Sequence, residues 1–185
     1  MAFGRIVALA LVALVVPAGA QARPYELKAR GSAKSFGAVQ AIGDFKPGSD
    51  ATLGAAIDVW GEPASARSVY RGTGCKVAWP GLGVRITFVN LGGGGSACKP
   101  DLGRAQAARV LRNERWHTAR GLHVADGLRR LKRLYPGASR HGRAYWLVTG
   151  RSLFGPQPTR YAVLAATVRD GKVSSFTLSI GAAGE

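Results

Sequence analysis

The sequence predicts an α+β fold in which two divergent helix-then-antiparallel-strands units form one antiparallel sheet layer, packed by the short helices. Three observations lead to this class. Apolar residues recur at helical spacing in residues 53–60 and again in residues 128–135. The segments after each helical stretch alternate apolar and other side chains, as half-buried strands do. Asp170-Gly171 joins two such segments, and this pair is typical of a two-residue hairpin turn.

The first 22 residues have the organisation of a secretory signal. Arg5 gives a basic start, residues 6–16 are apolar, Pro17 ends that run, and Ala20-Gln21-Ala22 offers small residues to a signal peptidase. The alternative is a membrane anchor, but crossing about 30 Å of hydrocarbon takes about 20 apolar residues. We therefore expect cleavage near Ala22, a secreted or extracytoplasmic protein, and no membrane span once the signal is removed.

The rest of the chain is predicted to form one domain. Residues 23–38 are polar, basic and small and show no periodicity, so we expect a disordered basic arm. Residues 39–181 are expected to form the single α+β domain, with units at about 48–100 and 122–181. Residues 182–185 are expected to form a tail.

Both expected helices have recognisable ends. Thr52 can cap the first helix with its hydroxyl, and Gly61 with Pro63 stops it. Asp126 is the expected cap of the second helix, which ends at Pro136-Gly137. The apolar stripes are Leu53, Ala56, Ile57 and Trp60 in the first helix, and Leu128, Leu131, Leu134 and Tyr135 in the second. Their similar layout, at an offset of about 75 residues, predicts a tandem repeat.

Strands are expected on either side of these helices. Residues 39–42 are expected to form a short first strand, and residues 144–148 another. The segment around Asn113 could be two short strands or a helix end, and the lack of a helical apolar stripe favours strands. Around the Asp170-Gly171 turn, alternation predicts a register in which paired residue numbers sum to 341. The predicted pairs are Tyr161 with Ile180, Val163 with Leu178, and Ala165 with Phe176.

A second hairpin is expected around residues 80–83. Alternation there predicts one wholly apolar face, formed by the pairs Trp79 with Val84, Val77 with Ile86, and Cys75 with Phe88. The opposite face would carry Lys76, Ala78, Arg85 and Thr87. After Asn90 the chain is then level with Cys75, so the following glycines can lead it round to Cys98.

Cys75 and Cys98 are the only cysteines. A thioredoxin-type redox site needs C-x-x-C, and a structural zinc site needs four ligands, whereas no histidine lies near these cysteines. In an exported chain the pair is most simply one disulfide, which would close a loop of about 24 residues. Gly92 to Gly95 lack the Lys-Ser/Thr pair and helix start of a phosphate-binding loop, so they are interpreted as slack in the closed loop.

The chain is strongly basic, with 26 Lys and Arg against 10 Asp and Glu and a net charge of +16. Residues 104–143 hold 11 of the basic residues and only two acids, Glu114 and Asp126. Export disfavours a nucleic-acid partner. An anionic cell-wall polymer, a lipid head group or an acidic protein suits an exported cation better. The alternative is that the charge reflects codon usage in the source and solubility.

No catalytic motif is present. The three histidines His117, His123 and His141 form neither H-x-x-x-H nor H-E-x-x-H, no serine lies in G-x-S-x-G, and the acids are sparse. The sequence therefore predicts no catalytic residue, no metal, no cofactor and no enzymatic activity. The alternatives are a secreted hydrolase with a non-sequential active site and a purely structural envelope protein.

The stretches TLGAAIDVWGEP and VADGLRRLKRLYPGA, each followed by strands, resemble the tandem-repeat fold of the β-lactamase inhibitor proteins. Each half of that fold is similar to the small lipoproteins of outer-membrane β-barrel assembly. The chain also looks like exported actinobacterial-type proteins with the L-Y-P-G helix end and a cysteine pair. The resemblance implies a non-enzymatic binding module. It does not imply β-lactamase inhibition, because the loops PGLG and GRSLFGPQPT contain no acid.

The predicted function is therefore a secreted binding module for an anionic envelope surface or a protein partner. Binding is expected through the sheet and loops, and the candidate contact residues are Arg112, Arg115, Trp116 and Phe154.

Overall fold

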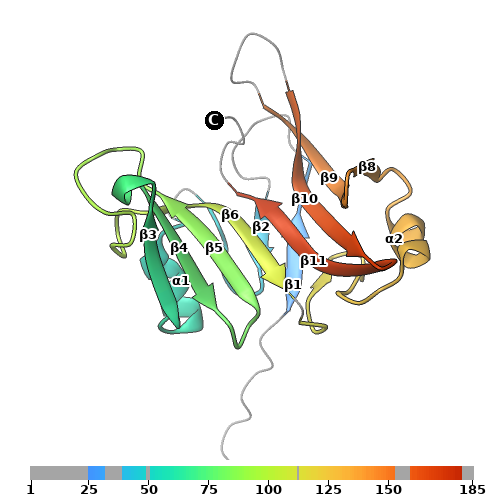
Figure 1. The fold of residues 1–185 in the computed structure, drawn as a ribbon, viewed down its shortest axis with the longest axis horizontal. Helices are drawn as coiled ribbons and strands as arrows, with labels where there is room; N and C mark the ends of the chain where they lie inside the picture. The colour runs from blue at the N-terminus through green and yellow to red at the C-terminus, as the bar shows by residue number, and fades with distance from the viewer. Residues whose placement is uncertain (1–24, 32–38, 49–50, 112, 153–158, 181–185) are drawn as a thin grey trace, which may run out of the picture.

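The computed structural model describes residues 25–31, 39–48, 51–111, 113–152 and 159–180 (Figure 1). The strands are β1 Glu26–Ala29, β2 Val39–Ile42, β3 Ser65–Val69, β4 Gly74–Trp79, β5 Val84–Val89, β6 Arg104–Leu111, β7 His117–Thr118, β8 Ser139–His141, β9 Ala144–Ser152, β10 Thr159–Arg169 and β11 Lys172–Ser179. The helices are α1 Leu53–Trp60, the 3₁₀ turn η1 Tyr70–Gly72 and α2 Leu128–Leu134.

The fold is mostly β, so the predicted α+β class of helix-then-strand units is wrong. Within the described residues, 50% lie in strands and 13% in helices. The two α-helices span only 8 and 7 residues, whereas β10 alone spans 11. Helices this short cannot stand alone in water, and here they accompany a sheet that supplies most of the structure.

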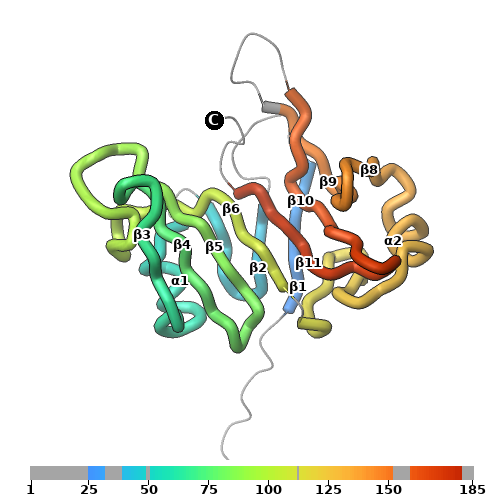
Figure 2. The backbone as a smooth tube through the Cα atoms, viewed as in Figure 1, coloured from blue at the N-terminus to red at the C-terminus, as the bar shows by residue number. Residues whose placement is uncertain are grey.

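Eight of the strands form one antiparallel sheet in the order β3-β4-β5-β6-β11-β10-β9-β8. The strands β2, β1 and β7 form a separate three-stranded sheet. Figure 2 shows β1 and β2 behind β6 and β11, on the same side of the large sheet as α1. Among the described residues, one face of the large sheet is therefore covered and the other is open.

The core lies between the large sheet and this cover. Trp60 of α1 packs edge-on against Trp79 of β4, with ring centroids 5.1 Å apart, and also contacts Phe45. The Trp79 indole N–H donates to the carbonyl of Gly61 at 2.9 Å, which joins the end of α1 to the sheet. Leu27 of β1 is fully buried. Each cover element therefore contributes to a core built on the sheet.

Strand β1 corrects the prediction of a disordered arm at residues 26–29, whereas residues 23–24 and 32–38 of that arm lie outside the described residues. Residues 27–29 pair with β2 and residues 26–27 pair with β7, and Leu27 is fully buried. A four-residue strand with one buried side chain has too little periodicity to be detected in sequence, and only its partners stabilise it.

The helix starts agree with the predictions in one case and differ in the other. Thr52 caps α1, because its hydroxyl accepts from the Ala55 N–H at 3.1 Å. Gly127, not Asp126, is the N-cap of α2. The Asp126 carboxylate instead accepts from the His123 N–H at 2.7 Å and lies 3.1 Å from Arg130 Nε. Asp126 therefore organises the preceding turn and pairs with the helix rather than capping it.

The predicted hairpin around residues 80–83 is confirmed. Strands β4 and β5 pair Trp79 with Val84, Val77 with Ile86 and Cys75 with Phe88. All six side chains are buried.

The register predicted for the β10–β11 hairpin is wrong by one residue beyond its turn. Asp170 and Gly171 both have positive φ, at 49° and 73°, as expected of the tight turn. Thr167 pairs with Ser175 and Val168 with Val173, so a bulge at Ser174 of β11 shifts the register, and Leu178 faces Leu164 instead of Val163. A bulge inserts one unpaired residue and leaves little trace in an alternating sequence.

Candidate functional site

The open face of the large sheet carries a continuous row of paired residues. Each member lies directly opposite the next, from the first edge strand to the last. In strand order, the row is Ser65, Ala78, Arg85, Arg109, Thr177, Ala165, Trp146 and Ser139. Residues next to the row in sequence point to the other face of the sheet, into the core. Examples are Val77, beside Ala78, and Ile86, beside Arg85, which are both buried. The row therefore defines the surface available to a partner.

Two pairs of like charges lie directly opposite one another on this face. Arg85 of β5 faces Arg109 of β6, and Arg67 of β3 faces Lys76 of β4. All four side chains are exposed. Like charges directly opposite each other destabilise a sheet. The repulsion among four cations on four adjacent strands therefore lowers the stability of the sheet, so these residues are not explained by a role in folding.

Two adjoining hollows lie over these cations, each of ≈ 460 Å³. They share Ala78, Arg85 and Arg109 in their linings. The first hollow adds Arg169 of β10, and the second adds Arg67 and Lys76. Neither lining includes an Asp, a Glu or a His, and the remaining lining residues are mostly Ala, Ser, Thr and Gly. Small side chains let a ligand approach the strands closely while the guanidinium groups surround it.

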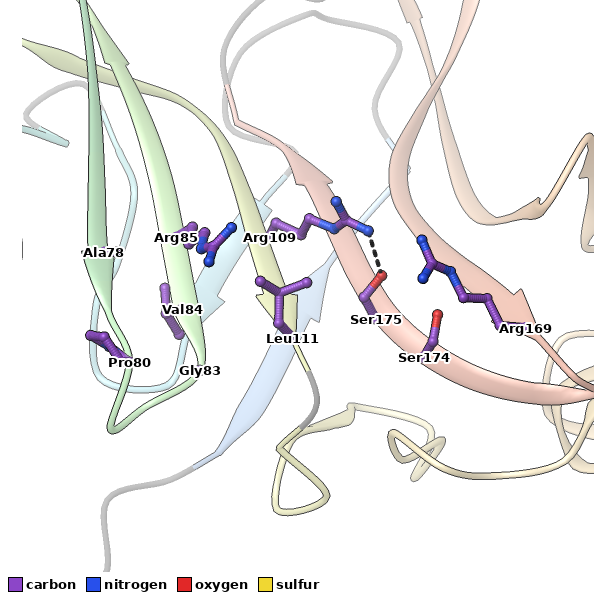
Figure 3. A pocket seen from close by; sticks show the side chains of 10 residues that line it. All are labelled: Ala78, Pro80, Gly83, Val84, Arg85, Arg109, Leu111, Arg169, Ser174 and Ser175. Atoms are coloured by element: carbon purple, nitrogen blue, oxygen red, sulfur yellow. Dashed lines mark hydrogen bonds between the residues drawn. The ribbon is translucent and has the colours of Figure 1, made fainter. Parts of the chain in front are cut away.

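Figure 3 shows the guanidinium groups of Arg85, Arg109 and Arg169 over the first hollow. Arg109 Nη2 donates to Ser175 Oγ at 3.4 Å, which orients the side chain toward β11. In the described part of the chain, the ion pairs are Lys28 with Glu26 and Arg130 with Asp126, so no internal carboxylate neutralises this face. Planar guanidinium groups with free donors are suited to bind carboxylate, sulfate or phosphate in a bidentate manner.

An aromatic group completes the row at its other end. The ring of His141 stacks on that of Trp146, with centroids 3.7 Å apart and 12° between the planes. Ser139 Oγ lies 3.1 Å from His141 Nε2. Both rings therefore form a rigid, partly exposed platform on the same face as the arginines.

Arg115 and Trp116, the predicted contacts that lie within the described residues, do not line these hollows. Arg112 and Phe154 lie outside the described residues. Arg115 is exposed, but its guanidinium lies 3.4 Å from the Tyr25 hydroxyl and 5.6 Å from that ring's centroid. Trp116 is 2% exposed, and its indole N–H donates to the Leu82 carbonyl. The Trp116 side chain therefore belongs to the core and is not presented to solvent.

Sequence reasoning missed Arg67 and Arg109 as site residues. A partial signal was present, since the predicted hairpin already placed Lys76 and Arg85 together on its polar face. The missing information was that β3 and β6 flank this hairpin and align further cations with it.

The disulfide between Cys75 and Cys98 is confirmed, with Cα atoms 5.1 Å apart. It indicates an oxidising, extracytoplasmic environment. In the residues that the structure describes, no helix is long and apolar enough to cross a membrane. Residues 92–95 are interpreted from sequence as slack, but hydrogen bonds hold this glycine run. The side-chain amide of Asn90 donates to the carbonyls of Gly93 and Gly95 and accepts from the Gly92 N–H.

Two tyrosines outside the open face have altered acidity. Burial raises the pKa of Tyr135 above its usual value, against the opposing effects of a hydrogen bond with Thr118 and the Arg120 charge. Burial also raises the pKa of Tyr161, whose hydroxyl has no hydrogen-bond partner among the described atoms. Both phenols are therefore protonated at neutral pH, and neither supplies a nucleophilic phenolate.

Comparisons with family models, curated proteins and solved structures return no significant match to this chain. The resemblance to the β-lactamase inhibitor proteins and the tandem repeat stay predictions based on the two helical stretches. The class that the structure itself defines is a disulfide-bonded, mostly β protein with one open, cationic sheet face.

Proposed function

We propose that the protein is a secreted, non-enzymatic binding module whose open sheet face binds an anionic polymer of the cell envelope. The observation that supports this most directly is the pair of opposed like charges, Arg85 with Arg109 and Arg67 with Lys76. An anionic ligand would remove the repulsion that each pair creates. An acidic protein surface is the other partner class that this charge arrangement suits.

The distribution of the cations favours an extended ligand. Arg67, Lys76, Arg85 and Arg109 come from four successive strands, and neighbouring strands lie about 4.8 Å apart. Positive charge therefore extends over about 15 Å across the strands rather than converging on one point. A polymer with regularly spaced phosphates or carboxylates can contact several of these side chains at once.

The hydrolase alternative predicts a deep pocket lined by a histidine and an acid. The two hollows on the open face have neither residue in their linings, so they favour binding over hydrolysis. His141, although on the same face, stacks on Trp146 and contacts Ser139 rather than a carboxylate.

Replacing Arg85 and Arg109 together by Ala is expected to weaken binding to a polyglycerol-phosphate polymer at least tenfold at low salt. The free energy of unfolding should stay unchanged or rise by about 0.2–1 kcal/mol, because the like-charge repulsion is removed. Binding is measured by biolayer interferometry at several salt concentrations, and stability by urea unfolding. Wild-type binding should weaken as salt rises, since exposed charges are screened.

The matched control is the double variant Arg129→Ala and Arg133→Ala on α2, which removes two exposed charges elsewhere. This control should keep most of its affinity. Equal losses in both double variants would mean that total charge, not the sheet face, attracts the polymer. Binding to an acidic protein but not to the polymer would select the other partner class.

Secretion is part of the same proposal, with a cleaved signal ending near Ala22. Residues 1–24 lie outside the described residues. Protein recovered from the extracytoplasmic fraction of a secreting host should begin at or near Arg23 by N-terminal sequencing. Recovery of exported protein that still carries residues 1–22 would contradict the cleavage.

A further inference from the structure

Tyr70 is an exposed aromatic residue at one end of the open face. It begins the 3₁₀ turn η1 between β3 and β4, and its side chain is 66% exposed. Among the described residues, Leu91 is the other large hydrophobic side chain that is exposed. Single exposed hydrophobic side chains are common on protein surfaces. Exposure alone therefore gives Tyr70 no role, whereas its backbone conformation and its contacts do.

The backbone of Tyr70 is held in a conformation that tyrosine rarely adopts. Tyr70 and Arg71 have φ of 52° and 54°, in the left-handed region that favours glycine. The N–H and the hydroxyl of Thr73 both donate to the Tyr70 carbonyl, at 3.2 and 2.8 Å. The Ala97 N–H donates to the Gly72 carbonyl at 2.9 Å, which joins the turn to the loop that the disulfide closes. Strained backbone of this kind persists where surrounding structure holds it, and it is concentrated at ligand-binding positions.

The Tyr70 ring packs on the open side of the sheet, at Gly74. Cys75 is fully buried in the core, so its neighbours Gly74 and Lys76 face the open side. A Cβ atom at Gly74 would lie 2.6 Å from Tyr70 Cδ2, so the absence of a side chain at Gly74 lets the ring lie this close. Lys76 is two residues further along β4, about 7 Å away along the strand. The ring therefore borders the cationic part of the open face.

We propose that the anionic polymer bound by the open face is a polysaccharide, and that Tyr70 stacks on one of its sugar rings. This inference rests on the proposed function and specifies the ligand class of the same site. The C–H groups on one side of a sugar ring form an apolar face, which packs on the electron-rich face of an aromatic ring. A carboxylate, sulfate or phosphate of the same chain then reaches Lys76 and Arg67, which lie opposite each other.

A polymer without sugar rings would use only part of this surface. Polyglycerol phosphate presents regularly spaced charge to the cations but has no flat apolar face for Tyr70. An anionic polysaccharide presents both groups within one repeating unit. The ring contact therefore selects among polymers that the cations alone attract in the same way.

The test compares two polymers by biolayer interferometry. Polygalacturonate consists of sugar rings that carry carboxylates, and polyglycerol phosphate has no ring. The variants are Tyr70→Phe, which keeps an aromatic ring, and Tyr70→Leu, which keeps an apolar side chain without one. We expect Tyr70→Leu to bind polygalacturonate roughly five- to tenfold more weakly than the wild type, and Tyr70→Phe to bind it equally well. Neither variant should change binding to polyglycerol phosphate.

Leu91→Ala is the matched control, because it removes the other exposed large hydrophobic side chain. It should leave both affinities unchanged. Wild-type affinity of Tyr70→Leu for polygalacturonate, or an equal loss in Tyr70→Phe or Leu91→Ala, would overturn the inference. If Tyr70→Leu fails to fold, NMR of the wild type decides, since galacturonate oligomers must shift the Tyr70 ring signals and polyglycerol phosphate must not.

The double variant Arg85→Ala and Arg109→Ala separates this inference from the proposed function. If it loses binding to both polymers while Tyr70→Leu loses neither, the anionic-polymer function stands and the sugar contact is refuted. If it binds both polymers as the wild type does while Tyr70→Leu loses polygalacturonate, the cationic function is refuted and the sugar contact stands.

Discussion

Removing the disulfide by changing both Cys75 and Cys98 to Ala is expected to lower the free energy of unfolding by about 3–3.5 kcal/mol. The cross-link joins residues 23 positions apart, and without it the unfolded chain regains the entropy of an open loop. Cys75 is fully buried on β4 opposite Phe88, so Ala is the substitution that leaves no new polar group in the core. Urea unfolding of the variant and the oxidised wild type measures the difference.

Reduction of the wild type provides the control for this prediction. The reduced wild type should unfold at nearly the urea concentration of the double variant, whereas a reductant should not affect the variant. The oxidised chain should also be two hydrogens lighter by mass. If reduction is complete by mass but leaves wild-type unfolding unchanged, the stabilising role of the disulfide is refuted.

Changing Trp116 to Ala is expected to destabilise the protein by about 3–5 kcal/mol, as large-to-small substitutions of buried aromatic residues do. Trp116 is 2% exposed and packs edge-on against Tyr25, with ring centroids 5.2 Å apart. Its indole N–H also donates to the carbonyl of Leu82, in the loop between β4 and β5. The substitution therefore empties a core position and removes one of the two side-chain hydrogen bonds that the Leu82 carbonyl accepts.

Arg115→Ala is the matched control for Trp116, since both residues came from the same set of predicted contacts. Arg115 is exposed, and its loss should change the unfolding free energy by no more than about 0.5 kcal/mol. Trp116→Phe should cost less than Trp116→Ala, because a phenyl ring still fills most of this buried position. A Trp116→Ala variant as stable as the wild type would contradict the role of Trp116 in the core.

Sequence patterns predict only part of the candidate site. Lys76 and Arg85 share the polar face of one hairpin, so their proximity follows from the alternation of side chains within residues 75–88. Arg109 joins them only because β6 pairs with β5, and Ser175, which orients it, lies 66 residues further along the chain. Convergence of charge from four strands is a property of strand order, which no local pattern contains.

Trp116 shows the same limit for single residues. In the sequence it follows Arg115 in a basic segment, and this setting is typical of a binding surface. Its burial depends on β1, whose residues were predicted to be disordered and which pairs in parallel with β7 beside it. Whether an aromatic side chain is exposed or buried depends on which segment, often distant in sequence, packs over it.

The sequence by itself determined the β4–β5 register, the Asp170-Gly171 turn, the Thr52 cap and the Cys75–Cys98 bond, because each depends on short-range pattern or on there being only two cysteines. Tertiary structure alone decided the mostly β class, the bulge in β11 and the alignment of the cations. The physical reason is that strands are stabilised by partners far away in sequence, and each pairing sets which side chains share a face.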